Sequence, residues 1–116
     1  MVGYLHKLML EDVEMRIYGL IYNQLLNGVV NKSTVARALN MSTRTLQNSL
    51  ASRGLTFREL LDRARFERAI LLLEDPSRSA KETALSLGFS SASNFARAFK
   101  RWTGRSPTDF RQATTR

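Results

Sequence analysis

Arginine, lysine and amide side chains that can hydrogen-bond to nucleic acid recur at helical spacing in two parts of this sequence. In residues 92–102, small and cationic residues alternate with an apolar stripe that includes Phe95, Phe99 and Trp102. Side chains three or four positions apart share one face of a helix, so the cations should point away from this stripe. Such a face suits the major groove of DNA, whose base edges present acceptors that arginine can bridge. The predicted outward residues are Ser93, Ala96, Arg97, Lys100 and Arg101.

A second face of the same kind is predicted over residues 43–52. Leu46 and Leu50 form its inward stripe. Arginine can bridge two acceptors of guanine, and glutamine or asparagine can pair with both edge groups of adenine. The alternative is a solvated polar helix face, and the spacing alone does not choose between the two. The outward residues, at positions i, i+3, i+4 and i+7, are Arg44, Gln47, Asn48 and Ala51.

Each of these helices follows a short helix and a tight turn. Gly88 is expected to adopt the left-handed backbone conformation, which glycine tolerates without strain and asparagine tolerates better than most residues. At a shift of 48, Asn40 stands in place of Gly88. The other matched positions are Ala36 with Ala84, Leu39 with Leu87, Met41 with Phe89 and Ser42 with Ser90. Beyond the turn the shift becomes 49, so that Leu46 matches Phe95. A helix-turn-helix unit that recurs within one small chain is hard to attribute to chance.

Composition narrows the functional classes. The 116 residues include 18 Lys and Arg against 10 Asp and Glu, a formal charge of +8, which predicts a polyanionic partner such as DNA, RNA or an acidic membrane surface. There is no cysteine and one histidine, His6, so no catalytic, metal or cofactor site is expected and the chain is not expected to be an enzyme. No apolar run approaches the roughly 20 residues of a membrane span, and no signal peptide is recognisable, so an intracellular location is expected.

The remaining pattern predicts helices throughout. Capping boxes at residues 56–59 and 79–82 predict two helix starts, the first opening a long connecting helix whose apolar run 69–73 should be packed on all sides. Gly104 should end the second outward-facing helix, and Pro107 should occupy the first turn of the last one. The expected organisation is an N-terminal linker or helix extension (1–10), a first helix-turn-helix subdomain (11–55), the connecting helix (56–74) and a second subdomain (75–116).

Two helix-turn-helix units joined by one long helix make the sequence resemble the DNA-binding domain of AraC/XylS-type bacterial transcription regulators. The resemblance covers roughly residues 12–111. It implies an all-α fold of about seven helices, with two recognition helices that enter successive major grooves. The matching residues are Arg65-Phe66-Glu67-Arg68-Ala69, Leu72-Leu73, Ala84, Gly88-Phe89, Phe95, Arg97, Phe99-Lys100, Gly104 and Pro107.

The resemblance also implies roles for individual residues. Asn48 stands where the family commonly has arginine, and Ala92 and Ala96 can offer only methyl contacts, for instance to thymine. Asn40, Gly88, Gly104 and Pro107 are expected to be structural. The expected base contacts are Arg44, Gln47, Asn48, Ser93, Ala96 and Arg97. The long side chains of Lys100 and Arg101, near the end of their helix, suit the phosphate backbone better than base edges. The expected phosphate contacts are Ser42, Thr43, Thr45, Asn94, Lys100 and Arg101.

The implied partner is double-stranded DNA carrying an asymmetric site, with two half-sites about one helical turn, or 34–36 Å, apart. RNA polymerase and a separate N-terminal sensing or dimerisation domain are further candidate partners, and no membrane partner is expected. The chain is expected to be a fragment of a longer regulator or a stand-alone member, located in the bacterial cytoplasm and at the nucleoid when bound. The alternative is a helical protein that binds RNA or any nucleic acid, but its aromatic side chains are predicted to point inward, where they offer no stacking platform.

Overall fold

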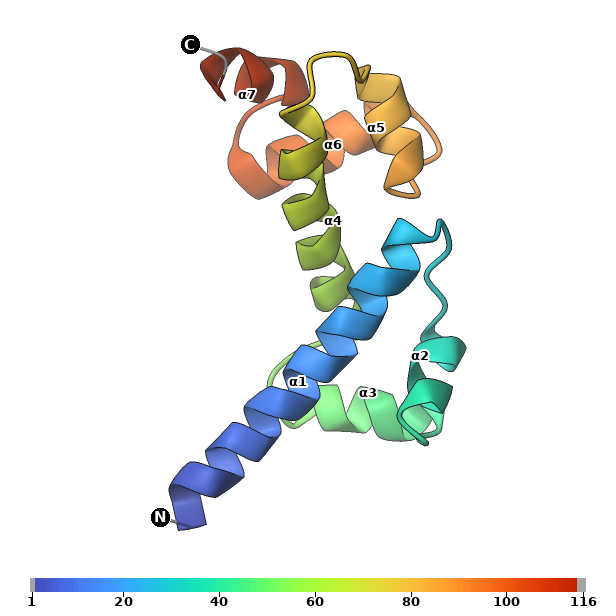
Figure 1. Ribbon diagram of the computed structural model, residues 1–116, viewed down its shortest axis with the longest axis vertical. Helices are drawn as coiled ribbons and strands as arrows, with labels where there is room; N and C mark the ends of the chain where they lie inside the picture. Colours follow the sequence, from blue (N-terminus) through green and yellow to red (C-terminus); the bar gives the residue numbers. More distant parts are fainter. Residues whose placement is uncertain (1, 115–116) are drawn as a thin grey trace. The chain divides into compact units, whose positions relative to one another are not determined.

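The computed structural model describes residues 2–114, with side chains described for residues 13–113. This part of the chain is all-α and contains no strand, which confirms the predicted fold of about seven helices (Figure 1). The helices are α1 (Val2–Leu26), α2 (Lys32–Ala38), α3 (Thr43–Ala51), α4 (Phe57–Leu73), α5 (Ala80–Ser86), α6 (Ala92–Thr103) and α7 (Pro107–Thr114).

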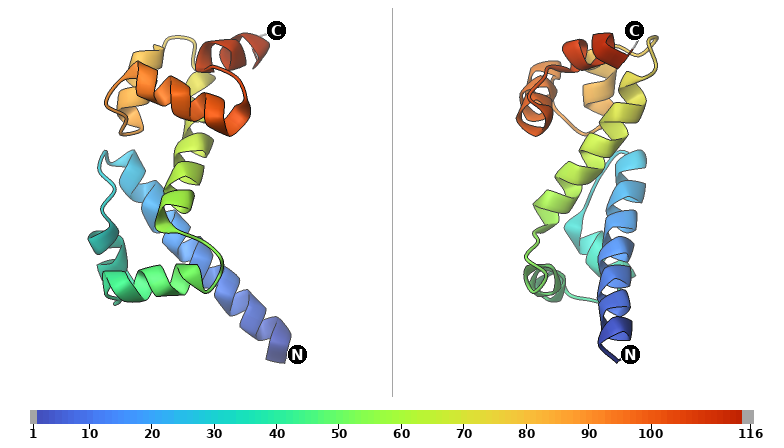
Figure 2. Two further views of the ribbon diagram at one scale, coloured as in Figure 1. Left: turned by 180° about the vertical axis from the view of Figure 1, so that it is seen from behind. Right: turned by 90° about the vertical axis from the view of Figure 1, so that its left-hand side faces the viewer.

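The chain divides into two compact units, Met1–Ala64 and Arg65–Arg116, and the division falls within α4. Each unit contains one pair of helices joined by a tight turn, α2 with α3 in the first and α5 with α6 in the second (Figure 2). The spacing of the two helix pairs along the chain matches the predicted internal repeat. Helices α2 and α5 begin 48 residues apart, whereas α3 and α6 begin 49 residues apart, so the extra residue of the second unit lies in its turn.

The core of the first unit is aliphatic. Ile17, Ile21 and Leu25 of α1 are buried in it. Burial of such side chains contributes about 1.5–3 kcal/mol each. The other buried apolar residues of this unit are Val35 and Ala36 of α2, Leu46 and Leu50 of α3, and Leu60 and Ala64 of α4.

The core of the second unit is built around Phe99. The stripe predicted on α6 is confirmed, with Phe95 and Phe99 fully buried and Trp102 half-buried. Aromatic pairs at centroid separations of 4.5–7 Å contribute about 0.5–1.5 kcal/mol beyond the area that they bury. The Phe99 ring therefore ties α6 to α4 and α7. Its centroid lies 6.2 Å from that of Phe66, 5.7 Å from Phe95, 6.5 Å from Trp102 and 5.3 Å from Phe110.

One expectation for α4 is wrong. Within the apolar run 69–73, Ala69, Leu72 and Leu73 are buried, but Leu71 is 51% exposed. Successive residues of a helix point about 100° apart, so five of them cover the whole circumference. Because the helices that pack on this part of α4 cover less than its full circumference, one side chain of the run faces solvent. A single exposed leucine is ordinary in a folded protein.

The turn between α2 and α3 is closed by the backbone. Asn40 has a φ of 56°, in the left-handed region. Its N–H donates to the carbonyl of Arg37 at 3.0 Å, and the N–H of Met41 donates to the carbonyl of Ala36 at 2.9 Å. These two bonds form a Schellman motif, in which the left-handed residue lets the chain fold back onto the last turn of the helix.

The turn between α5 and α6 repeats this geometry. Gly88 has a φ of 86°, and the N–H of Phe89 donates to the carbonyl of Ala84 at 3.0 Å. Arg65 of α4 secures this turn, since its Nε donates to the carbonyl of Leu87 at 3.1 Å and its guanidinium lies 5.0 Å from the centre of the Phe89 ring. The short turn is therefore fixed both by its own backbone and by the helix beneath it.

Side chains also secure the helix ends. The capping box predicted at residues 56–59 is confirmed, because the N–H of Glu59 donates to the Thr56 hydroxyl and the N–H of Thr56 donates to the Glu59 carboxylate. Ser79 caps α5. At the other end of α4, Arg111 Nε donates to the carbonyl of Leu73 at 3.0 Å, which anchors α7 on the connecting helix.

The left-handed turn predicts the effect of adding one methyl group at Gly88. A Cβ there would meet no atom closer than 3.6 Å, so the expected cost arises from backbone strain and not from a clash. We expect Gly88→Ala to lower the free energy of unfolding by about 1–2 kcal/mol, and Gly88→Val to lower it further. Asn40→Gly should be neutral or slightly stabilising. Thermal or urea unfolding measures each difference.

Gly19 provides the matched control, because it lies inside α1 and a Cβ added to it would point into open space. Gly19→Ala should raise stability by about 0.5–1 kcal/mol through helix propensity. If the two alanine variants changed stability in the same direction, strain at Gly88 would not be the cause.

Candidate nucleic-acid interface

The first candidate surface is the outward face of α3. Leu46 and Leu50 are fully buried, which orients the helix and leaves its opposite side in solvent. The structure brings the predicted base-contact residues of this unit together on that side. Arg44, Gln47 and Asn48 are all exposed, and Ala51 continues the face by one further turn.

The beginning of α3 is held by a pair of hydroxyls. Ser42 is the N-cap, and its Oγ accepts a hydrogen bond from the N–H of Thr45 at 3.1 Å. The same hydroxyl donates to Thr45 Oγ1 at 2.9 Å. Ser42, Thr43 and Thr45 are exposed around this cap. The first turn of α3 therefore presents hydroxyl groups that retain acceptor and donor capacity at the surface.

The second candidate surface is the outward face of α6. Ser93, Arg97, Lys100 and Arg101 are exposed, whereas Ala96 is half-buried beside them. Lys100 and Arg101 lie in the last turn of the helix, where cations are also favoured by the helix dipole. The buried ring of Phe99 fixes this face relative to the core.

A chain of side-chain hydrogen bonds runs along α6. Asn94 Nδ2 donates to Ser90 Oγ at 2.6 Å, and the Arg97 guanidinium donates to Asn94 Oδ1. These bonds hold an exposed arginine in one place, which reduces the conformational entropy lost when it binds a ligand. The spacing of Asn94 and Arg97, three residues apart on a helix, is a sequence signal for this contact.

The cap of α6 is Ser91, whose Oγ accepts from the N–H of Asn94 at 3.1 Å. Ser91 thus corresponds to Ser42 in the repeat, since Ser42 immediately precedes α3 and Ser91 immediately precedes α6. Ser90 instead accepts a bond from the Asn94 side chain. The two adjacent serines therefore have different tasks, which their residue type does not reveal.

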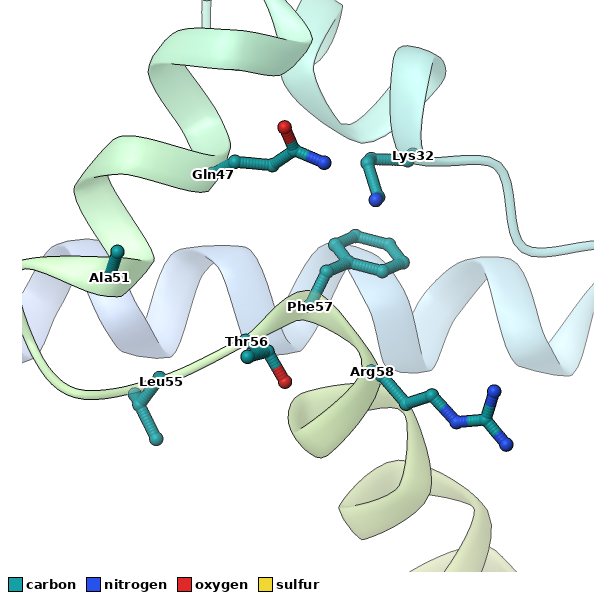
Figure 3. Close-up of a pocket in the computed structure, with 7 residues that line it drawn as sticks. All are labelled: Lys32, Gln47, Ala51, Leu55, Thr56, Phe57 and Arg58. Carbon is teal, nitrogen blue, oxygen red and sulfur yellow. The ribbon is translucent and has the colours of Figure 1, made fainter.

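A pocket of about 300 Å³ lies beside α3, and the sequence patterns did not indicate it (Figure 3). Two of its walls are Gln47 and Ala51, on the outward face of the recognition helix. Lys32 lies across from them, with its Nζ 5.5 Å from the centre of the Phe57 ring. The full lining is Lys32, Gln47, Ala51, Leu55, Thr56, Phe57 and Arg58.

The described residues form no metal centre and no membrane span. Within residues 13–113, no three acidic or histidine side chains converge where they could hold a metal ion. None of the helices in the described part of the chain is long and apolar enough to cross a membrane.

Comparison with known proteins shows which family the sequence matches. The family model described as a helix-turn-helix domain matches residues 35–113. The chain is 44% identical over 80 residues to the HTH-type transcriptional regulator VqsM of Pseudomonas aeruginosa, an alignment that covers 69% of this chain and 25% of that protein. The chain thus spans about a quarter of the length of this relative.

Solved structures share the fold. A DNA-binding transcriptional dual regulator from Escherichia coli K-12 superimposes with a TM-score of 0.79 at 27% identity, covering 86% of this chain and 89% of that one. A probable AraC family transcriptional regulator from Rhodopseudomonas palustris has a TM-score of 0.72 at 22% identity, covering 85% and 94%. The second likeness concerns the fold alone.

The different tasks of the two serines before α6 predict different costs of removing them. Ser91→Ala should lower the free energy of unfolding by about 1 kcal/mol, because it leaves an N-terminal N–H of α6 without its cap. Ser90→Ala should cost at most a few tenths of a kcal/mol, since the bond that it removes is exposed. Urea unfolding of both variants checks the pair, and equal losses would contradict the assignment of Ser91 as the cap.

Proposed function

Because this chain belongs to the AraC-type helix-turn-helix family of DNA-binding transcription regulators, we propose that it binds a specific double-stranded DNA site through α3 and α6. In this proposal each helix enters a major groove, and the two grooves are successive ones on the same duplex. The major groove has the width to admit an α-helix and presents a different pattern of donors and acceptors for each base pair.

One observation carries this proposal. In both units a helix that is buried on one side presents amide, hydroxyl and cationic side chains on the other, directly after a left-handed turn. A buried stripe of leucine or phenylalanine holds the backbone, so the exposed side chains are available to a ligand. The excess of positive charge over the whole chain matches the phosphate backbone of DNA.

Base recognition is assigned to the middle of each helix. Arg97 is best suited to guanine, because its guanidinium can bridge O6 and N7, and its bond to Asn94 holds it ready for this contact. Gln47 and Asn48 suit adenine, and Ala96 offers a methyl group to thymine. The proposed base contacts are Arg44, Gln47, Asn48, Ser93, Ala96 and Arg97.

Phosphate contacts are assigned to the helix ends. Lys100 and Arg101 have long side chains in the last turn of α6, where they reach a backbone more readily than a base edge. Ser42, Thr43 and Thr45 provide hydroxyls at the start of α3. Asn94 is proposed for a phosphate as well, although its amide already bonds to Ser90 and Arg97, which gives it a positioning role.

The faces of α3 and α6 differ in sequence, so we propose that one chain reads an asymmetric site of two unlike halves. The halves are expected to lie about 34–36 Å apart, as in other proteins that place helices in successive grooves. We propose that the spacing of these two halves is fixed.

The remaining assignments concern the whole regulator. Because the chain spans only about a quarter of its curated relative, we propose that it acts together with a sensing or dimerisation domain and with RNA polymerase in the bacterial cytoplasm. The family consists of transcription regulators, and we propose that this chain has no enzymatic activity. Its domain organisation is proposed as two helix-turn-helix subdomains, 11–55 and 75–116, with a connecting helix between them.

Selection of binding sites from a random duplex pool tests the proposal. The selected duplex should bind at least a thousandfold more tightly than a random duplex at the same salt concentration, as is usual for specific regulators. Equal affinities for the two duplexes, or preference for single-stranded RNA, would instead favour a general nucleic-acid-binding protein.

Arg97 should govern one base pair of the selected site. Arg97→Ala is expected to cost about 1–3 kcal/mol on the selected site and to relax the preference at one position, because a bidentate contact to guanine is lost. Competition titrations with each base pair varied in turn measure this effect.

Lys100→Ala provides the contrast to Arg97→Ala. This variant should weaken selected and random duplexes alike and make the slope of log K against log salt shallower by about 0.9. A uniform loss for Arg97→Ala, with no change in base preference, would reassign Arg97 to the phosphate backbone.

A shift in half-site spacing should also weaken binding. Inserting about 5 bp between the halves moves the second half to the opposite side of the duplex, so affinity should fall to that of a single half-site. The control duplex carries the same insertion outside the site and should bind as before. Unchanged affinity after the internal insertion would mean that only one unit engages DNA.

A further inference from the structure

We propose that the pocket beside α3 is a binding site for a sugar–phosphate segment of the DNA strand that borders the groove occupied by α3. Lys32 is the residue that pairs with the phosphate. This inference rests on the proposed function and extends the interface from the recognition helix to the beginnings of α2 and α4.

The first argument is continuity with the candidate interface. Gln47 and Ala51 line the pocket and also belong to the outward face of α3. A duplex that contacts this face therefore borders the pocket. Figure 3 shows the Gln47 side chain turned toward Lys32, whose ammonium group lies over the Phe57 ring. A base contact by Gln47 and a backbone contact by Lys32 would lie side by side.

The second argument is charge. The lining residues include two cations, Lys32 and Arg58, and no carboxylate. The Nε of Arg58 lies 4.0 Å from Oδ2 of Asp62. The Arg58 side chain extends away from Phe57 (Figure 3). Lys32 is instead held above the aromatic ring at 5.5 Å, a cation–π contact that stabilises the ammonium group in this position. Lys32, which lies beside the outward face of α3, is thus held in place before a ligand arrives.

The third argument is the mixed character of the lining. The Phe57 ring and the side chains of Ala51 and Leu55 make part of the pocket apolar, whereas Lys32, Gln47 and Thr56 carry polar groups. A deoxyribose presents apolar carbon and hydrogen atoms, and the phosphate that follows it carries a negative charge. An apolar wall with a cationic rim matches these two parts. The volume of about 300 Å³ lies at the lower limit for small-molecule sites, which favours a short segment of a larger ligand.

Lys32→Ala tests the proposal in the full 116-residue chain on the selected duplex. We expect the slope of log K against log salt to become shallower by about 0.9. Accordingly, the ratio of wild-type to variant affinity should shrink about 3.5-fold between 50 and 200 mM salt. Lys32→Arg should keep the wild-type slope. Arg16→Ala is the matched control, because it removes one exposed positive charge from α1 of the same unit and should leave the slope nearly unchanged.

A phosphate scan identifies the contacted group. Single phosphates around the α3 half-site are replaced by neutral methylphosphonates, and binding of the wild-type chain, Lys32→Ala and Lys32→Arg is compared. At one position the replacement should weaken the wild-type chain and Lys32→Arg but not Lys32→Ala, because the two changes remove the same contact. If the losses of binding free energy from the methylphosphonate and from Lys32→Ala were additive at every position, the proposal would be overturned.

The outcomes separate this inference from the proposed function. If the wild-type chain did not distinguish the selected duplex from a random one, the proposed function itself would fail. If it did, but Lys32→Ala and Arg16→Ala gave the same slope and the same scan, only the pocket assignment would be wrong. Loss of transcriptional regulation by Lys32→Ala with unchanged DNA binding would also overturn the assignment and give the pocket to a protein partner.

Discussion

A single residue with positive φ, placed between two short helices, is the constraint on which both candidate surfaces depend. Asn40 and Gly88 allow the backbone to close a Schellman motif, so the chain reverses within a few residues. The following helix then lies across the preceding one, with its apolar stripe in the core and its polar face in solvent. Without this turn the same amphipathic helices could form but would not be held at this angle.

The two units use one backbone plan with different cores. Leu46 and Leu50 anchor α3, whereas rings grouped around Phe99 anchor α6, which is also the longer helix. Because the anchors point inward, they leave the outward residues unconstrained by packing. The same architecture can therefore present amides on α3 and cations on α6. This separation of anchor and surface would allow two copies of one motif to bind the two unlike half-sites that we propose.

On α6 and beside α3, neighbouring side chains hold a cationic side chain in position before DNA binds. Asn94 holds Arg97 along α6, and Phe57 holds Lys32 next to α3. Ordering these long side chains in advance reduces the entropy that binding would otherwise remove. In a nucleic-acid interface, contacts to phosphates position the protein and contacts to base edges supply specificity. We therefore expect the flank of α3 and the end of α6 to set the register in which the two faces read the duplex.

The sequence by itself determined the features that arise within one helix or one turn. Apolar spacing marked the buried stripes of α3 and α6, the internal repeat marked both helix-turn-helix units, and the capping box at residues 56–59 marked the start of α4. Only the tertiary structure decided which helices meet. In the folded chain Leu71 is exposed, Ser91 is the N-cap of α6, and Lys32 lies over the Phe57 ring. Spacing along a helix follows from backbone geometry alone, whereas contacts between distant residues depend on how the whole core packs.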